Sequence, residues 1–281
     1  MIDLHLHTTA SDGRCPPDEI AAVARRAGLA VIAVTDHDTV AGLAAAARGA
    51  AAEGLRLIAG IEVTAVQEGA DVHVLGYFLD PLARRLTAFL ARQRVDRVRR
   101  LREMAARLDG LGLPVDVDRL FENAGAEESG RAVGRPLLAR ALVDAGHLDS
   151  RREAFDLYLA EGQPAWVPRR APSPAEVVAI IHDAGGLASL AHPGLLGRDE
   201  WVPPMAAAGL DAIEAYYVDH SPELTIHYRE LASRLRIAMT GGSDYHGNPA
   251  HGPERPGTCV LPLDVFRALE ALRPAPRDQD R

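Results

Sequence analysis

The run Val31-Ile32-Ala33-Val34-Thr35-Asp36-His37 decides the fold of this chain. Four β-branched residues and one alanine lead directly into an acid and a histidine, and a short continuous run of this kind is typical of a buried parallel strand. Comparable runs lead into His5, Glu62, His192 and Asp244. Because parallel strands end at the same edge of a sheet, polar side chains at their ends predict one site built from many strands.

Strand and helix signals alternate along most of the chain. Proline and acid at residues 16–19 open a helix that Gly28 closes, and Ser173 opens another in a capping-box pattern. The Glu68-Gly69 pair predicts a hairpin turn, and with it one antiparallel strand. Repeated strand–helix units close a parallel sheet into a barrel, and an open doubly wound sheet is the alternative. The predicted strands are residues 2–5, 31–35, 57–66, 72–78, 187–191, 212–216 and 237–240, with 258–261 as the candidate for a last one.

Residues 82–163 depart from this alternation. Apolar residues at three- and four-residue steps predict a long amphipathic helix over 82–109, and two further helices are expected at about 135–145 and 150–160. The segment is therefore interpreted as a helical insertion in an α/β barrel. The predicted parts are a barrel domain formed by 1–81 and 164–273, an insertion subdomain over 82–163 and a disordered tail at 274–281.

The composition limits the class of protein. At 281 residues, 47% hydrophobic and 25% charged, the chain can bury a full core. No apolar run approaches the roughly 20 residues of a membrane span, and the first residues lack the pattern of a signal peptide. The two cysteines, Cys15 and Cys259, do not make a disulfide framework. We therefore expect a cytoplasmic protein that does not engage a membrane, of unknown oligomeric state.

Charge is spread unevenly along the chain. The net charge of −8 argues against binding to duplex DNA. Residues 84–107 nevertheless hold nine arginines against Asp96 and Glu103. A basic segment of this kind suits a polyanionic substrate, although arginine-rich helices are often only solvated faces.

The pair His5 and His7 is the first sign of a metal site. Side chains alternate along a strand with period two, so both imidazoles can lie on one face and reach one ion. Glu62 ends a hydrophobic strand, where a carboxylate is costly unless a cation compensates it. Asp244 and His246 repeat the two-residue spacing after a glycine pair. Together these clusters predict a metal centre and a hydrolytic metalloenzyme.

Several short motifs follow one another in order along the chain. They are His5-Leu6-His7-Thr8, Ser11-Asp12-Gly13, Thr35-Asp36-His37-Asp38, Gly60-Ile61-Glu62, Ala191-His192-Pro193 and Gly242-Ser243-Asp244-Tyr245-His246. In this order they resemble the PHP family, named for domains of bacterial DNA polymerases and for histidinol phosphatase. The resemblance covers residues 1–80 and 170–260 and implies a distorted seven-stranded (βα) barrel of TIM-like type. With the helical insertion, the chain looks most similar to the subgroup of 3′,5′-nucleoside bisphosphate phosphatases and 5′–3′ exoribonucleases.

The resemblance implies a cluster of two or three ions, with one carboxylate bridging two of them. Many relatives place a histidine where Asp12 stands, so the third site is expected to be the weaker one. Mixed nitrogen and oxygen ligands suit Mn²⁺, Zn²⁺ or Fe²⁺, and the resemblance favours Mn²⁺. The implied ligands are His5, His7, Glu62 and Asp244 for the first ion, Glu62, His73 and His192 for the second, and Asp12, His37 and His246 for the third.

The expected chemistry is hydrolysis of a phosphoester. Two adjacent ions lower the pKa of a bridging water and neutralise charge on the phosphoryl oxygens. We expect in-line attack by this metal-bridging hydroxide, with Asp244 as a ligand that also accepts a proton. Protonation of the leaving group falls to Asp12, Asp36 or His37, which the sequence does not rank.

A bisphosphate substrate needs a cationic pocket for the phosphate that is not cleaved, and arginine binds phosphate oxygens bidentately. Arg99, Arg131 and Arg135 are the candidates. Tyr245, between two implied ligands, is a further candidate for substrate contact. Glu214 either orients a metal ligand or pairs with an arginine.

Three functional hypotheses remain open. The leading one is a nucleotide-binding phosphatase that removes the 3′-phosphate of nucleoside 3′,5′-bisphosphates, and histidinol phosphate is a further candidate substrate. The enzymatic alternative removes nucleotides from the 5′ ends of short RNAs with the same metals. The non-enzyme alternative is a metal-stabilised interaction module, against which the intact ligand motifs count.

Overall fold

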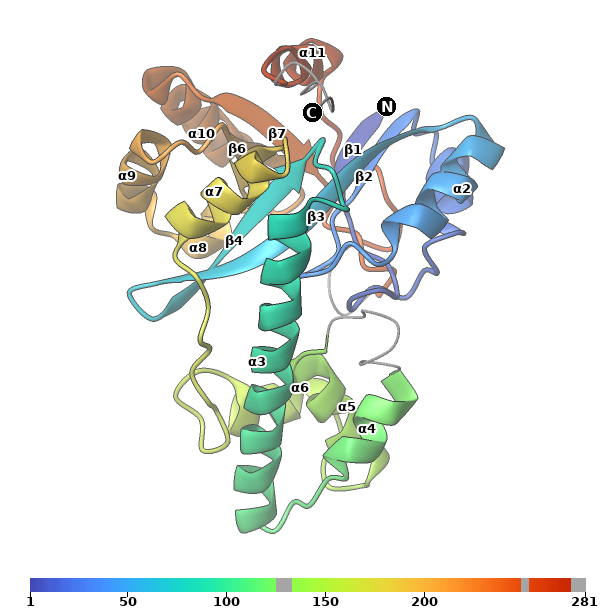
Figure 1. Ribbon diagram of the computed structural model, residues 1–281, viewed down its shortest axis with the longest axis vertical. Helices are drawn as coiled ribbons and strands as arrows, with labels where there is room; N and C mark the ends of the chain where they lie inside the picture. The colour runs from blue at the N-terminus through green and yellow to red at the C-terminus, as the bar shows by residue number, and fades with distance from the viewer. Residues whose placement is uncertain (125–132, 249–252, 274–281) are drawn as a thin grey trace. The chain divides into compact units, whose positions relative to one another are not determined.

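The computed structural model describes residues 1–124, 133–248 and 253–273, and it contains a seven-stranded sheet (Figure 1). Its strands lie side by side in chain order. Four neighbouring pairs are parallel, and the fourth strand runs antiparallel to both of its neighbours. The strands are β1 (Ile2–Leu6), β2 (Val31–Val34), β3 (Arg56–Gln67), β4 (Ala70–Tyr77), β5 (Leu187–Leu190), β6 (Ala212–Tyr217) and β7 (Ala238–Gly242).

The first and last strands meet at their carboxyl ends. Leu6 forms a parallel bridge with Tyr245, where the His7 N–H donates to the Tyr245 carbonyl at 2.9 Å. The Tyr245 N–H donates back to the His5 carbonyl at 3.3 Å. The sheet is therefore a nearly closed barrel, which confirms the predicted distorted seven-stranded α/β fold and brings residues 5–7 beside residues 244–246.

Helices pack against the outside of this sheet. Helix α2 contacts β3, α7 contacts β3 to β5, α10 contacts β6 and β7, and α11 contacts β7. Sequence signals set several helix ends: Ser173 and Glu176 form a capping box at α7, and Gly54 ends α2 in a left-handed conformation at φ 64°. The helices of this part are α1 (Ile20–Arg26), α2 (Leu43–Glu53), α7 (Pro174–Asp183), α8 (Pro193–Leu196), η2 (Asp199–Trp201), α9 (Val202–Ala207), α10 (Pro222–Leu235) and α11 (Leu263–Ala271).

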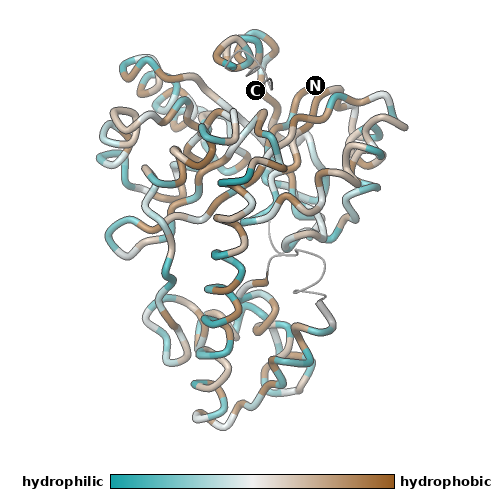
Figure 2. The backbone as a smooth tube through the Cα atoms, viewed as in Figure 1, coloured by the Kyte–Doolittle hydropathy of each residue, from teal (hydrophilic) through white to brown (hydrophobic). Residues whose placement is uncertain are grey.

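The buried strand β2 shows how the core is divided. Ile32 and Val34 pack with residues of α1 and α2, whereas Ala33, which points to the other face, belongs to a separate buried cluster with Leu4 and Tyr77. Hydrophobic stretches run along the strands near the N-terminus (Figure 2). A strand buried on both faces therefore leaves its polar residues only at its end.

The chain divides into two compact units, one formed by 1–89 and 172–281 and the other by 90–171. The second unit has its own hydrophobic core, which includes Leu101, Leu138 and Leu159. A short π-helical turn, η1 (Phe155–Leu159), continues directly from α6. The helices of this part of the chain are α3 (Arg84–Gly110), α4 (Val117–Ala124), α5 (Arg135–Asp144) and α6 (Arg151–Ala154).

Two details differ from the sequence-based expectation. Residues 258–261 do not form a strand, although the Leu261 N–H donates to the Ile2 carbonyl at 2.9 Å. Helix α4 was not predicted, because its eight residues are too few for a clear period. The predicted tail, 274–281, lies outside the described residues. None of the helices that the structure describes is long and apolar enough to cross a membrane.

Candidate metal centre

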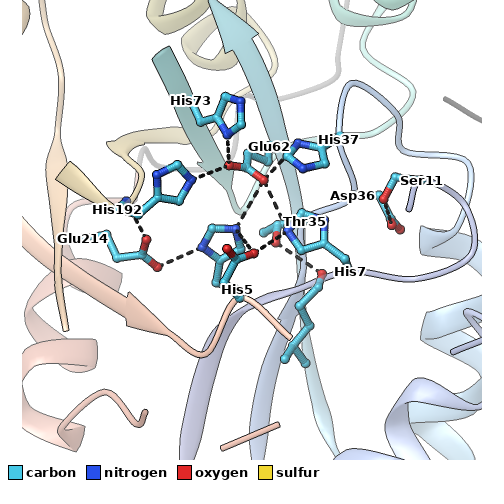
Figure 3. A network of polar contacts seen from close by, with 12 residues as sticks. His5, His7, Ser11, Thr35, Asp36, His37, Glu62, His73, His192 and Glu214 are labelled. Carbon is cyan, nitrogen blue, oxygen red and sulfur yellow. Dashed lines mark hydrogen bonds and ion pairs between the residues drawn. The ribbon is translucent and has the colours of Figure 1, made fainter. Parts of the chain in front are cut away.

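Glu62, on β3, is the centre of a cluster of imidazoles (Figure 3). Its Oε2 atom lies 3.3 Å from His5 Nε2, 3.2 Å from His7 Nε2 and 3.1 Å from His37 Nδ1. His5 and His7 come from the end of β1, and His37 follows β2. One carboxylate oxygen thus meets side chains from two neighbouring strands.

The other oxygen of Glu62 meets a different pair of histidines. Oε1 lies 2.8 Å from Nδ1 of His73, on β4, and 3.1 Å from Nε2 of His192, which follows β5. Five imidazoles therefore surround one fully buried carboxylate. This arrangement is typical of a carboxylate that bridges two cations, because each oxygen has its own set of nitrogen neighbours.

Asp244 completes the side of the cluster nearest to β1. Its Oδ1 lies 3.0 Å from His7 Nε2 and 3.3 Å from His5 Nε2. Its backbone angle φ is 53°, which is uncommon for residues other than glycine. Gly242, two residues earlier, must be glycine for steric reasons, because a Cβ there would lie 2.4 Å from the His5 Cβ. Gly242 thus lets β7 approach β1 closely enough to bring Asp244 beside His5 and His7.

Asp12 lies in the loop after β1 and faces two further histidines. Its Oδ1 is 3.4 Å from His246 Nε2, and its Oδ2 is 3.8 Å from His37 Nε2. The Asp12 side chain is 33% exposed, whereas that of Glu62 is 1% exposed. Asp12 therefore stands at the open side of the cluster.

All nine predicted metal ligands lie together in this cluster. The ligand atoms of eight of them form three groups, within each of which all atoms lie within 4.8 Å of one another. His192 contacts Glu62 but falls outside these groups, and His37 takes its place beside His73. The groups are His5, His7, Glu62 and Asp244; His37, Glu62 and His73; and His7, Asp12, His37 and His246.

Several buried nitrogens of the cluster fit a cation. Among the described residues, His7 Nε2, His37 Nδ1 and His73 Nδ1 have no hydrogen-bond partner, although each lies close to a Glu62 oxygen. Buried polar atoms are normally paired, so nitrogens left bare and facing carboxylates indicate a site for a divalent ion. Imidazole and carboxylate donors suit a transition metal.

Burial and neighbouring charges shift the pKa values of several groups in the cluster. Burial disfavours the imidazolium of His7, but the carboxylates of Asp244 and Glu62 outweigh burial and raise its pKa to about 10. Burial would raise the pKa of Glu62, but the surrounding imidazoles hold it well below its usual range. For His37 burial wins over Glu62 and Asp12, and its pKa falls to about 3. Positive charge is therefore favoured beside Glu62, where a proton or a metal ion can supply it.

Two predicted residues are not brought into the cluster. The carboxylate of Asp36 accepts hydrogen bonds from the Thr8 N–H at 2.8 Å, the Thr8 hydroxyl at 2.7 Å and the Ser11 hydroxyl at 2.6 Å. Figure 3 shows it beside Ser11, apart from the histidines. The ring of Tyr245 packs in the core with residues of α1 and α2 and is 7% exposed. Both side chains contact the surrounding structure, and their predicted roles in catalysis and substrate binding stay predictions.

The predicted substrate arginines lie in the second unit. Arg99 pairs with Asp96 and Glu103 on its own helix, at 2.7 Å each. Arg135 lies over the Phe155 ring, with its guanidinium carbon 5.8 Å from the ring centre. Arg131 lies outside the described residues. The roles of these arginines in substrate binding stay predictions.

Two further residues support the cluster and were not found from the sequence. The Tyr217 hydroxyl donates to Asp244 Oδ2 at 3.1 Å. Asp3 is fully buried and accepts hydrogen bonds from the Ser243 hydroxyl at 2.6 Å and the Gly257 N–H at 2.8 Å. Burial raises the pKa of Asp3 to about 6. The position of an acidic residue within an apolar strand could have indicated Asp3, whereas nothing in the sequence distinguishes Tyr217.

The contacts of Asp36 predict a role in anchoring the loop that carries Asp12. Asp36→Asn is expected to destabilise the protein by about 2 kcal/mol, because hydrogen bonds to a buried carboxylate are lost. Thr8→Val combined with Ser11→Ala removes the two hydroxyl donors and leaves the Thr8 N–H, so both variants should lower stability and turnover together. Urea unfolding and steady-state kinetics measure this. Loss of turnover in Asp36→Asn alone would instead favour proton transfer by Asp36.

Comparisons with known proteins agree with this geometry. The PHP domain model matches residues 3–128. A 3′,5′-nucleoside bisphosphate phosphatase of Chromobacterium violaceum is 34% identical over 98% of this chain and 99% of its own length. A 5′-3′ exoribonuclease of Escherichia coli is 34% identical over 88% of this chain and 85% of its own. A phosphoribosyl 1,2-cyclic phosphate 1,2-diphosphodiesterase of Eggerthella lenta is 33% identical over 87% and 94%.

The similarity extends to a solved structure. A crystal structure from Bifidobacterium adolescentis, assigned to the metal-dependent phosphoesterases, superposes with a TM-score of 0.86 at 34% identity, covering 96% of this chain and 95% of that one. Similarity of this extent includes the barrel and the segment inserted into it. The chain therefore belongs to the PHP family and is a metal-dependent phosphoesterase.

Proposed function

We propose that this enzyme removes the 3′-phosphate from nucleoside 3′,5′-bisphosphates. The support is the full-length similarity to the Chromobacterium violaceum phosphatase, which extends over 98% of this chain and 99% of that protein. The exoribonuclease and the cyclic phosphate diesterase are equally similar where they align but leave more of this chain unmatched. A phosphomonoester is thus the first substrate class to test.

The observation that carries the metal chemistry of this proposal is the division of neighbours around Glu62. His5, His7 and Asp244 lie on the side of one oxygen, and His73 and His192 on the side of the other. We propose that these residues would hold two ions and share Glu62 between them, and that Asp12, His37 and His246 would form a weaker third site. When bound, the ions supply an activated water and neutralise charge on the phosphoryl group.

The protein side chains would orient this reaction. Tyr217 fixes one oxygen of Asp244, so that the other faces His5 and His7. Asp12 and His37, 33% and 19% exposed, face the open side of the cluster, and we assign the leaving group to that side. The donor set of carboxylate oxygen and imidazole nitrogen suits Mn²⁺, Zn²⁺ or Fe²⁺. Because the resemblance to this subgroup of the PHP family favours Mn²⁺, we propose Mn²⁺ as the metal.

A comparison of substrates on Mn²⁺-loaded protein tests the proposal. Adenosine 3′,5′-bisphosphate is expected to release phosphate with the highest kcat/KM, ahead of 5′-phosphorylated oligoribonucleotides, histidinol phosphate and ribose cyclic phosphates. Preference for the oligoribonucleotides would replace the proposal with the exoribonuclease, which the Escherichia coli relative represents. No hydrolysis of any of them by metal-loaded protein would favour an interaction module.

A further inference from the structure

Glu214 is a buried carboxylate that the proposed chemistry does not use. It lies on β6 and is 0% exposed. Its Oε1 is 3.0 Å from His5 Nδ1, and its Oε2 accepts a hydrogen bond of 2.8 Å from the His192 backbone N–H. Within the described part of the chain, no arginine forms an ion pair with Glu214. Among the described residues, its hydrogen-bond partners are His5 and His192, which are both candidate metal ligands.

The contact with His5 selects which nitrogen can bind a metal. When Nδ1 carries a proton donated to Glu214, the lone pair of the neutral ring lies on Nε2. That atom faces Glu62 Oε2 and Asp244 Oδ1, at 3.3 Å each. A carboxylate behind an imidazole fixes the orientation of the ring and raises its basicity toward a metal.

The contact with His192 holds an unusual backbone. His192 has a backbone angle φ of 27°, which residues other than glycine rarely adopt. The turn is held by Glu214 at the His192 N–H and by His220, whose Nε2 accepts from the Gly194 N–H at 3.2 Å. The same turn brings His192 Nε2 to 3.1 Å from Glu62 Oε1.

We propose that Glu214 is a positioning residue that supports two metal sites at once, through the ring of His5 and the backbone of His192. The inference rests on the proposed ligand set around Glu62. His5 lies beside one oxygen of Glu62 and His192 beside the other. Loss of Glu214 therefore affects both sites, whereas loss of His192 affects one.

Glu214→Gln tests this role with little change in volume. Glutamine offers one acceptor oxygen where two N–H groups need one each, so one contact is lost, and the other loses the negative charge that strengthens it. Titration of the metal-free variant with Mn²⁺ by calorimetry should show both tight sites weakened by about 10- to 100-fold, the range for supporting residues of this kind. His192→Ala should weaken one site and leave the other close to wild type.

Asp211→Asn is a matched control. Asp211 joins the same two kinds of partner, accepting from the Ala188 N–H at 2.8 Å and lying 2.7 Å from His182 Nε2, but it precedes β6 and is outside the cluster. Its replacement should leave both Mn²⁺ affinities unchanged. Unchanged affinities in folded Glu214→Gln would overturn the proposal.

A measurement on the wild-type protein tests the same idea without a variant. In ¹⁵N-labelled protein loaded with Zn²⁺, His5 is expected to carry its proton on Nδ1, and a proton on Nε2 would overturn the proposal. Failure of wild-type protein to bind Mn²⁺ or Zn²⁺ would refute the ligand set itself. Normal binding with no effect of Glu214→Gln would refute only the role of Glu214.

Discussion

Glu62→Gln is expected to slow phosphoester hydrolysis by at least about 10³-fold, which corresponds to about 4 kcal/mol of lost transition-state stabilisation. Glutamine keeps one carbonyl oxygen but places an amide group where the second oxygen of Glu62 meets its histidines. Because five imidazoles lie within 3.3 Å of the two oxygens, no rotation of the amide satisfies both sides. The variant lacks the negative charge and the second carboxylate oxygen of Glu62, so it should no longer bridge two ions.

The measurement is kcat at saturating Mn²⁺ together with the manganese bound per chain. Glu68→Gln is a matched control, because Glu68 lies in the exposed turn between β3 and β4 and faces no histidine of the cluster. It should keep full turnover and metal content. Near-normal turnover in Glu62→Gln, with two ions still bound, would remove the bridging role of Glu62.

The affinity for metal is expected to rise steeply with pH. In the metal-free protein the carboxylates of Asp244 and Glu62 outweigh burial and raise the pKa of His7 to about 10. His7 is therefore protonated at neutral pH, and an ion must displace that proton. Each proton that must be released raises the apparent affinity about tenfold per pH unit at any pH below about 10, the pKa of His7 in the metal-free protein.

Calorimetric titration with Mn²⁺ in buffers of different ionisation enthalpy counts the protons released. At least one proton per chain is expected at pH 7, and the pKa of His5, also raised well above its usual value, adds to the release. A mutation outside the cluster such as Asp211→Asn should leave the count unchanged. Affinity that does not change between pH 6.5 and 9 would show that His7 is not a ligand that gives up a proton.

Much of the barrel could be predicted because its signals are local. A continuous apolar run that ends in polar residues marks a buried parallel strand, and β2 has this form. Closure between β1 and β7 places His7 beside Tyr245, as expected for a barrel. The unit of residues 90–171 was less predictable, because a short helix such as α4 and the π-helical turn after Ala154 leave no distinct period.

Side chains alternate between the two faces of a strand, and this alternation explains which residues of each motif face the cluster. It correctly groups His5 with His7 on one face of β1. The same rule turns Asp36 away when His37 faces the cluster, and it turns Tyr245 away between Asp244 and His246. The contacts of Glu214 and Tyr217 depend instead on tertiary placement, which no spacing in the sequence specifies.

Anomalous diffraction at the manganese absorption edge, from crystals grown with Mn²⁺, tests the central claim most directly. Two strong peaks are predicted, one beside each carboxylate oxygen of Glu62, with a weaker third peak between Asp12 and His246 at higher Mn²⁺ concentration. A single ion that contacts only one oxygen of Glu62, or ions bound elsewhere on the barrel, would contradict the account.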